Sequence, residues 1–203
     1  MKLRKRLRGS VALAFAAMAI AIALLFLLNP LGEPVIAEEP VAMNAHLDLP
    51  AWMDIELEDA LSGETFTLRQ FVGKPILMES FAVWCSICLT QQKQLAQLVE
   101  LEGDRIVHIA LNTDPNEDLE KVREHAMRHG FDWYYAVAPI EMTQMLIDEF
   151  GLTVVNAPRA PVVLIEEDGS SRLLPNGVKS AEDLLEEIGL EPNAQADDEE
   201  ESG

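Results

Sequence analysis

The chain alternates between continuous apolar runs and stretches in which apolar residues recur every three or four positions. A continuous run is typical of a strand buried on both faces, whereas the wider spacing is typical of a helix with one buried face. The predicted strands include the runs 75–78, 105–112, 131–137 and 161–165. The predicted helices cover residues 89–99, 116–129, 140–149 and 180–188. Strands that alternate with helices predict an α/β domain with a mixed central sheet flanked by helices.

Two hairpins are predicted beside these elements. Residues 53–57 alternate between apolar and polar, a Gly-containing turn follows, and residues 65–68 return, which predicts an N-terminal β-hairpin extension. The turn at residues 166–170 predicts a second hairpin, in which 171–174 pairs with the preceding strand. Ser180 is expected to cap the last helix, with Asp183 at the capping-box position.

The first 28 residues have the pattern of a signal anchor or a signal peptide. Five basic residues precede an uncharged apolar stretch over 11–28, which is just long enough to span a bilayer. We favour a retained anchor, although small residues at 35–37 also fit a cleavage site. Both interpretations place the rest of the chain outside the cytoplasm, as a membrane-anchored domain or, after cleavage, as a secreted or periplasmic one.

Composition divides the remaining chain into three parts. Residues 29–50 contain four prolines among acidic and small residues, which predicts a linker. Residues 51–190 have the usual length of one domain, and residues 191–203 predict a disordered acidic tail. The net charge of −20 argues against nucleic acid or anionic lipid headgroups as the main partner of the domain.

The only two cysteines, Cys85 and Cys88, follow Trp84 at the predicted junction between a strand and a helix. Unpaired backbone N–H groups at a helix N-terminus favour a thiolate, so Cys85 is expected to be reactive. A zinc site needs four ligands, and a structural disulfide across two residues would stabilise little. The pattern therefore predicts reversible dithiol chemistry, with no metal and no cofactor. In an exported chain another component, such as a membrane electron donor or acceptor, must set its redox state.

The order of elements and the motif resemble the thioredoxin superfamily, and more narrowly the TlpA-like membrane-anchored thiol–disulfide oxidoreductases. The resemblance covers residues 52–189 and is carried by three matches. Trp84-Cys85-x-x-Cys88 follows the central strand, Pro161 precedes a strand as the family's cis-proline does, and residues 113–150 have the length of an insertion found in this branch. The resemblance implies a thioredoxin-like protein-disulfide oxidoreductase.

The resemblance also implies a role for each matching residue. Cys85 would attack a partner disulfide, and the more buried Cys88 would resolve the mixed disulfide. Trp84 would belong to the surface on which client protein thiols and disulfides dock, or it would be a plain core aromatic. Pro161, if cis, would place the Ala160 backbone beside Cys85, where a bound peptide could pair with it.

Glu79 lies inside the otherwise apolar central strand, where thioredoxins keep a buried acid. Burial would raise the pKa of its carboxyl, which could then accept and return the proton of Cys88 near neutral pH. The alternative is an edge strand from which Glu79 points into solvent. A central strand has no inexpensive place for a charge, so we favour the catalytic interpretation.

Three functions compete. The leading hypothesis is an extracytoplasmic thiol–disulfide oxidoreductase, which the resemblance suggests reduces partners such as cytochrome-maturation proteins. A thiol peroxidase needs a Pro and a Thr or Ser ahead of its cysteine, where this chain has Ala82 and Val83. A copper chaperone of the same fold has a wider cysteine spacing and a His near the proline, and this sequence has neither.

Overall fold

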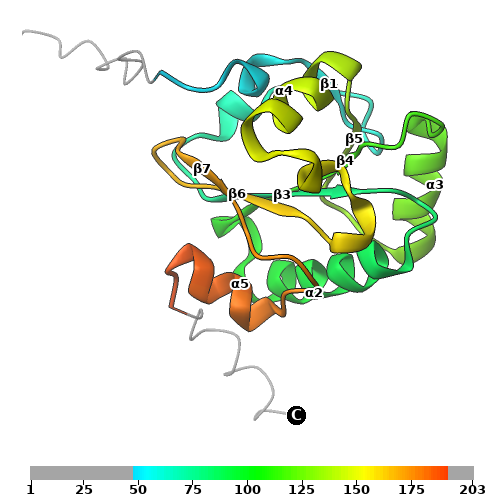
Figure 1. Ribbon diagram of the computed structural model, residues 1–203. Coiled ribbons are helices and arrows are strands. Elements are labelled where there is room, and N and C mark those ends of the chain that lie inside the picture. The colour runs from blue at the N-terminus through cyan, green and yellow to red at the C-terminus, as the bar shows by residue number, and fades with distance from the viewer. Residues whose placement is uncertain (1–47, 192–203) are drawn as a thin grey trace, which may run out of the picture. The chain divides into compact units, whose positions relative to one another are not determined.

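Two sheets organise the residues that the computed structural model describes, which are residues 48–191 (Figure 1). The larger sheet contains β3 (Ile76–Phe81), β4 (Val107–Asn112), β5 (Tyr134–Val137), β6 (Val162–Ile165) and β7 (Ser171–Leu173). The smaller sheet pairs β1 (Leu57–Glu58) with β2 (Thr65–Phe66). The α-helices are α2 (Ser86–Glu102), α3 (Leu119–His129), α4 (Ile140–Phe150) and α5 (Ala181–Ile188). Short 3-10 helices are η1 (Ala51–Asp54), η2 (Leu68–Phe71), η3 (Gly103–Arg105), η4 (Leu152–Val155) and η5 (Ala157–Arg159).

The larger sheet has the strand order β5-β4-β3-β6-β7, so β3 is its central strand. β3 is parallel to β4 and antiparallel to β6, and this mixture confirms the predicted sheet type. All six residues of β3 are buried. Its carboxyl end leads into α2, and that connection contains both cysteines.

The two faces of the sheet carry separate hydrophobic clusters, because side chains alternate along each strand. Leu77 and Phe81 of β3 face the cluster that holds the apolar faces of α2, α3 and α5. Ile76 and Met78 face the other cluster, where α4 and η1 pack. Figure 1 shows the corresponding layers, with α2 and α5 on one side of the sheet and α4 on the other. Glu79 lies two residues from both Leu77 and Phe81, so its side chain points to the same face, the α2 side.

The predicted N-terminal hairpin exists, but its strands are shorter than expected. Residues 53–57 were expected to form a strand, whereas residues 51–54 form η1 and pairing is confined to β1 and β2. Trp52 and Met53 are neighbours and both are buried in the same cluster. A strand would have sent these two side chains to opposite faces, so only a helical turn can bury both on one side.

Two further boundaries differ from the prediction. The second helix begins at Leu119 and not at 116, because the carboxylate of Asp118 accepts a hydrogen bond from the Lys121 N–H at 3.0 Å and caps it there. The stretch between α4 and β6, for which no element was predicted, contains η4 and η5. The predicted capping box of Ser180 and Asp183 at α5 is confirmed.

The predicted signal anchor at 1–28, nearly all of the linker at 29–50 and the tail beyond residue 191 lie outside the described residues. Within 48–191, no helix is both long enough and apolar enough to cross a membrane.

The buried carboxylate of Asp59 fixes the small sheet against β5. It accepts hydrogen bonds from the backbone N–H of Tyr135 at 3.1 Å and from the N–H of Ser62 at 2.9 Å. The neighbouring Ala60 N–H donates to the carbonyl of Tyr135 at 2.7 Å. One carboxylate therefore organises the β1–β2 turn and attaches it to the edge of the main sheet.

We expect Asp59→Ala to lower the free energy of unfolding by about 1–3 kcal/mol, because it leaves a buried backbone donor without a partner. Urea denaturation followed by circular dichroism measures this change. Asp104→Ala is the control, because the Asp104 side chain is 98% exposed and its removal should change stability little. Equal stability of the two variants would contradict the assignment.

Candidate active site

The two cysteines lie where β3 is followed by α2. Cys85 is the N-cap residue of α2, and its Sγ accepts a hydrogen bond from the Cys88 backbone N–H at 3.2 Å. Cys88 lies in the first turn, and its Sγ donates to the carbonyl of Ala157 in η5 at 3.2 Å. Both thiols are free, with exposed fractions of 4% for Cys85 and 1% for Cys88. The site is therefore a pair of buried free thiols, of which Cys85 is slightly the more exposed residue.

The environment of Cys88 opposes loss of its proton. Burial raises the pKa of the Cys88 thiol strongly, and the hydrogen bond with Cys85 and the negative charge of Glu79 raise it further. A base close to the sulfur is therefore needed before Cys88 can act as a nucleophile near neutral pH.

Glu79 is fully buried in the middle of β3, paired with Ala110 of β4 and Val162 of β6. The predicted position of Glu79 in a central strand is confirmed, and the alternative, an edge strand with Glu79 exposed to solvent, is wrong. Among the described residues, neither carboxyl oxygen has a hydrogen-bond partner of ordinary geometry. Burial raises the pKa of Glu79 well above its usual value, while the nearby Gln92 amide and the positive charge of Lys179 act in the opposite direction.

Gln92 connects this carboxyl to α3. It is fully buried on α2, and its Oε1 lies 2.7 Å from Nε2 of His125. Burial lowers the pKa of His125 to about 4, and the positive charges of His129 and Arg128 add to the effect. A neutral His125 therefore holds Gln92 in place at neutral pH, with the amide beside Glu79.

Two acidic residues after β4 hold the loop in front of Cys85. The Trp84 indole Nε1 donates to Asp114 at 2.6 Å, and the Val83 N–H donates to Glu117 at 2.8 Å. The Trp84 hydrogen bond is the largest cause that lowers the pKa of Asp114. Trp84 is 64% exposed, so the core-aromatic alternative is wrong.

The segment at Pro161 differs from the conditional prediction of a cis bond. Between residues 48 and 191 no peptide bond is cis, and Ala160 instead has a left-handed backbone with φ of 46°. The Ala160 N–H donates to the carbonyl of Ala157 at 2.9 Å, and its own carbonyl accepts from Lys179 at 2.6 Å. Both backbone groups of Ala160 are thus already engaged within the chain. Pro161 is attached to the central strand, because its carbonyl accepts from the Ser80 N–H at 3.1 Å.

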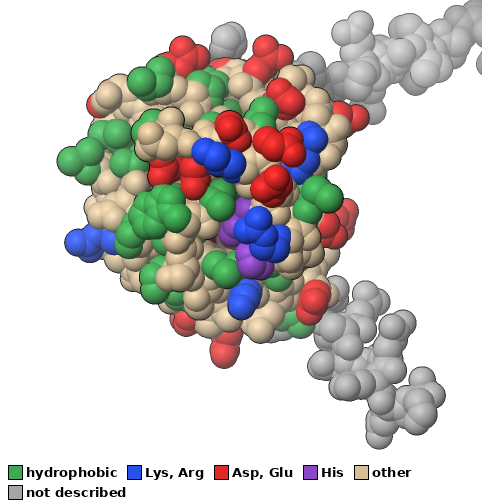
Figure 2. Space-filling model, turned by 90° about the vertical axis from the view of Figure 1, so that its right-hand side faces the viewer, with side chains coloured by type: hydrophobic (Ala, Val, Ile, Leu, Met, Phe, Trp, Pro, Cys, Tyr) green, Lys and Arg blue, Asp and Glu red, His purple; other side chains and the backbone are tan. Residues whose placement is uncertain are grey.

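A shallow groove of about 450 Å³ lies beside the cysteine loop. Its lining includes Trp84, Leu152, Val155 and Pro158, with Asp114 at its polar side. Leu152 is 73% exposed, and Ile87 of α2 is 43% exposed. Figure 2 views the end of the molecule toward which β3 runs and shows hydrophobic side chains gathered on one part of that face.

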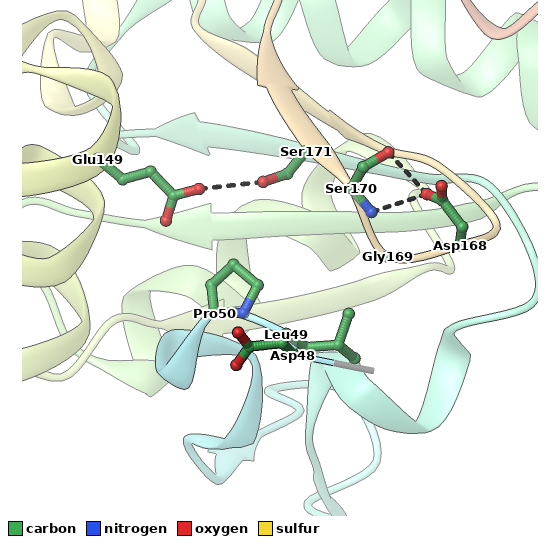
Figure 3. A pocket seen from close by; sticks show the side chains of 8 residues that line it. All are labelled: Asp48, Leu49, Pro50, Glu149, Asp168, Gly169, Ser170 and Ser171. Atoms are coloured by element: carbon green, nitrogen blue, oxygen red, sulfur yellow. Dashed lines mark hydrogen bonds between the residues drawn. The ribbon is translucent and has the colours of Figure 1, made fainter. Parts of the chain in front are cut away.

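A second, polar cleft lies at the opposite end of the sheet (Figure 3). There Asp168 accepts from Ser170, and Glu149 accepts from Ser171, so the two carboxylates are held by neighbouring hydroxyl groups. Among residues 48–191, no group of three or more His, Cys, Asp or Glu side chains is placed to hold a metal ion.

The predicted site residues therefore meet at one end of β3, together with groups that the sequence reasoning missed. Asp114, Glu117 and Lys179 are the main additions. Asp114 and Glu117 follow β4, which is parallel to β3, and polar residues after adjacent parallel strands meet at the same edge of a sheet. That signal could have indicated them. Nothing in the local sequence around Lys179 indicates that this lysine is buried.

Comparisons with known proteins agree with this geometry. The model of the Redoxin family matches residues 48–179. An uncharacterized protein of Haemophilus influenzae is 31% identical over 98 residues, which cover 48% of this chain and only 58% of that protein. The thioredoxin-like protein YneN of Bacillus subtilis is 27% identical over 133 residues, which cover 64% of this chain and 73% of YneN.

Two solved structures share this fold at low sequence identity. A thiol:disulfide interchange protein of the thioredoxin family from Chlorobium tepidum is 18% identical with a TM-score of 0.56, covering 66% of this chain and 90% of its own. A secreted disulfide oxidoreductase of Mycobacterium tuberculosis is 16% identical with a TM-score of 0.51, covering 68% and 96%. These likenesses show the thioredoxin fold.

The family match supports the predicted class of enzyme, a thioredoxin-like disulfide oxidoreductase, and the narrower TlpA-like branch is compatible with it. Because the family model matches more than half of the 203 residues, and because the fold and the Cys-x-x-Cys pair agree with it, this chain belongs to the Redoxin family.

Proposed function

We propose that the chain is an extracytoplasmic thiol–disulfide oxidoreductase that exchanges disulfides with partner proteins through Cys85 and Cys88. One observation carries the proposal: a free thiol pair at the start of α2 lies in the field of Glu79, a carboxyl buried in the central strand without a hydrogen-bond partner of ordinary geometry among the described residues. A purely structural role does not account for such a carboxyl, because burying it costs stability. The basic and apolar N-terminal sequence and the secreted relative from Mycobacterium tuberculosis support the extracytoplasmic location.

In the reductive direction, the Cys85 thiolate attacks one sulfur of a partner disulfide. A mixed disulfide forms, and the first partner sulfur leaves as a thiolate. The Cys88 backbone N–H donates to the Cys85 sulfur, and this bond together with the positive end of the α2 dipole favours negative charge there.

Cys88 then loses its proton and attacks the Cys85 sulfur. The Cys85–Cys88 disulfide forms, and the second partner sulfur leaves as a thiolate. Two electrons pass to the partner, and each partner thiolate takes up a proton from solvent or from the site. Glu79, as carboxylate, accepts the Cys88 proton and later returns it, because its raised pKa brings it closer to that of a thiol.

Client proteins are proposed to dock on the groove beside Trp84. The indole is exposed and oriented by Asp114, and the adjoining apolar side chains give a surface for an unfolded or extended segment. The backbone N–H and carbonyl of Ala160 are bonded to Ala157 and Lys179. A client strand could therefore pair with Ala160 only after these hydrogen bonds break. A membrane electron donor or acceptor is proposed to restore the pair after each turnover.

The residues argue against the two other functions. The Ala82-Val83-Trp84 segment lacks the hydroxyl and proline that a thiol peroxidase places before its cysteine. This chain lacks the wider cysteine spacing of the copper chaperone, and it also lacks the histidine near the proline, because Arg159 precedes Ala160 and Pro161.

The cysteine roles predict opposite outcomes for two serine variants of the full chain. Cys85→Ser should abolish reduction of insulin disulfides, because the attacking sulfur is lost. Cys88→Ser should accumulate a mixed disulfide with insulin, because the first attack still occurs and resolution does not. Non-reducing gels and mass spectrometry detect the adduct. Retained turnover in Cys85→Ser would exclude Cys85 as the nucleophile.

Replacing the buried acid should raise stability and lower activity together. Glu79→Gln should slow resolution at pH 7 on the order of tenfold to a hundredfold, because Cys88 loses its base. In the unfolded chain Glu79 has its ordinary pKa of 4.5, whereas burial raises this pKa in the folded chain. Wild-type stability therefore falls as pH rises through this interval, and the stability gain of the Gln variant should grow.

Urea denaturation of both proteins at pH 5 and pH 8 measures this growth, and rapid-quench kinetics measure resolution. Glu102→Gln is the matched control. Glu102 is also a buried acid, but it lies at the end of α2 away from the cysteines, where it pairs with Arg105. A stability gain that does not change with pH, together with unchanged resolution, would rule out the acid–base role.

Truncation of the exposed indole should affect large substrates alone. Trp84→Ala should raise KM for insulin about fivefold or more, as expected for the loss of about 1 kcal/mol of docking free energy. The rate with hydroxyethyl disulfide, a molecule much smaller than the groove, should remain close to that of the wild type. Ile140→Ala is the control, because Ile140 is 89% exposed and does not line the groove. Equal effects on both substrates would contradict a docking role.

A further inference from the structure

Lys179 is a buried lysine whose ammonium group is fully engaged by backbone carbonyls. Its residue is only 7% exposed, in the loop between β7 and α5. The Nζ atom donates to the carbonyls of Ala160 at 2.6 Å, Gly177 at 2.7 Å and Pro175 at 3.1 Å. An ammonium has three N–H donors, so each of them has an acceptor. Burial of a charge is costly, and a fold that needed only a loop closure could use a neutral side chain.

The backbone of Lys179 is attached to α2 by a buried amide. Its N–H donates to Oε1 of Gln91 at 2.8 Å, and its carbonyl accepts from Nε2 of Gln91 at 3.1 Å. Gln91 is fully buried and lies three residues after Cys88 on the same helix. The lysine is therefore fixed relative to the first turns of α2.

The ammonium group of Lys179 is connected to the Cys88 sulfur through Ala160 and Ala157. The Ala160 carbonyl that Lys179 holds belongs to a residue in the left-handed conformation, which costs energy for any residue except glycine. The N–H of Ala160 donates to the carbonyl of Ala157 at 2.9 Å, and this same carbonyl accepts the Cys88 thiol at 3.2 Å. A second bond, from the Gly177 N–H to the Arg159 carbonyl at 2.9 Å, attaches the lysine loop to η5.

The charges around Lys179 come from two sides. Toward the interior it faces Glu79 of β3, and on the solvent side it lines a cleft with four charged residues: Arg172, Asp183, Glu186 and Glu187. Burial lowers the pKa of Lys179 to about 8, and the negative charges of Glu79 and Glu187 oppose this. The interaction is mutual, so the positive charge of Lys179 limits how far burial raises the pKa of Glu79.

We propose that Lys179 is a positioning residue for the resolving step of thiol–disulfide exchange. Its ammonium holds Ala160 and thereby the turn whose Ala157 carbonyl orients the Cys88 thiol, and it supplies the buried positive charge that faces Glu79. The inference rests on the proposed function and deepens it. Lys179 touches neither sulfur, so it acts through Ala157 and Glu79 and not on the reacting atoms.

The proposal separates the two halves of the reaction. In the first half, Cys85 attacks and a mixed disulfide forms, and no contact of Lys179 reaches Cys85. In the second half, the Cys88 proton passes to the Glu79 carboxylate, the Cys88 sulfur bonds to Cys85, and the partner sulfur leaves. Only this half depends on the orientation of the Cys88 thiol and on the protonation of Glu79.

The test follows both halves with glutathione disulfide as the probe. The reduced full chain is mixed with the probe and quenched with acid, and mass spectrometry counts chains that carry one glutathione. In Lys179→Met, formation of the adduct should keep its wild-type rate, and decay of the adduct should slow about tenfold or more, because a small displacement of a reacting group is enough for such a loss. Lys74→Met is the matched control, since Lys74 also donates to a backbone carbonyl, that of Asp104, but lies before β3 at the far end of the sheet.

A pH profile of adduct decay provides the readout that a merely structural lysine would not change. Loss of the positive charge raises the pKa of Glu79, so the profile of Lys179→Met should move to higher pH. In the Glu79→Gln background, Lys179→Met should produce no further shift. Lys179→Gln keeps a donor without the charge and serves if the Met variant does not fold; it should show the same shift with a smaller loss of rate.

The outcomes distinguish the two proposals. If the wild-type chain forms no glutathione adduct, the proposed function fails. A second outcome is that the wild type forms and resolves the adduct, and that the adducts of the folded Lys179 variants decay at the wild-type rate with an unshifted pH profile. In that case only the role of Lys179 is overturned. Equal slowing of adduct formation and decay would also overturn it, because that result indicates general disruption of the site.

Discussion

The main energetic constraint on this structure is a carboxyl group, that of Glu79, buried in the central strand. β3 is buried along its whole length between two hydrophobic clusters, yet it carries a carboxyl group at Glu79. An apolar residue there would extend the α2-side cluster formed by Leu77 and Phe81, whereas a carboxyl that is charged or unpaired weakens it. Both neighbouring strands pair with β3 at this position, β4 through Ala110 and β6 through Val162. The cost is therefore fixed by the topology, and the surrounding side chains can only moderate it.

The groups that moderate this cost come from elements distant in sequence. Gln92 of α2 lies on one side and is held by the neutral ring of His125 on α3. Lys179 supplies positive charge from the loop before α5. None of them forms an ordinary ion pair with Glu79, and a close pair would hold the carboxyl permanently ionised. A carboxyl that is only partly compensated can change its protonation with the state of the nearby thiol, which a fully paired one could not do at neutral pH.

The sequence was sufficient for those features that depend on local pattern. The continuous apolar runs identified β3, β4 and β6, and Ser180 with Asp183 identified the start of α5, because these signals lie within a few residues. The prediction failed where tertiary burial overrides the local pattern. Residues 53–57 alternate as a strand would, but Trp52 and Met53 pack on the same side in a 3-10 turn. Lys179 could not be predicted, because the carbonyls that bind it are assembled from two separate loops. The exposure of Trp84 likewise depends on Asp114, thirty positions away.

The two sulfurs are supported by different parts of the fold, and this division has a consequence for catalysis. The loop before Cys85 is held from the β4 side, where Glu117 binds Val83 and Asp114 binds Trp84. The Cys88 thiol is held from the opposite side, by the Ala157 carbonyl of η5. A client that docks on the groove contacts Trp84 and also Val155 and Pro158, which belong to η4 and η5. Under the proposed function, a client docked there would touch both supports at once. The Ala157 carbonyl holds the Cys88 thiol in the orientation that resolution needs, so the groove proposed to bind the client and the turn that orients the resolving sulfur share η5.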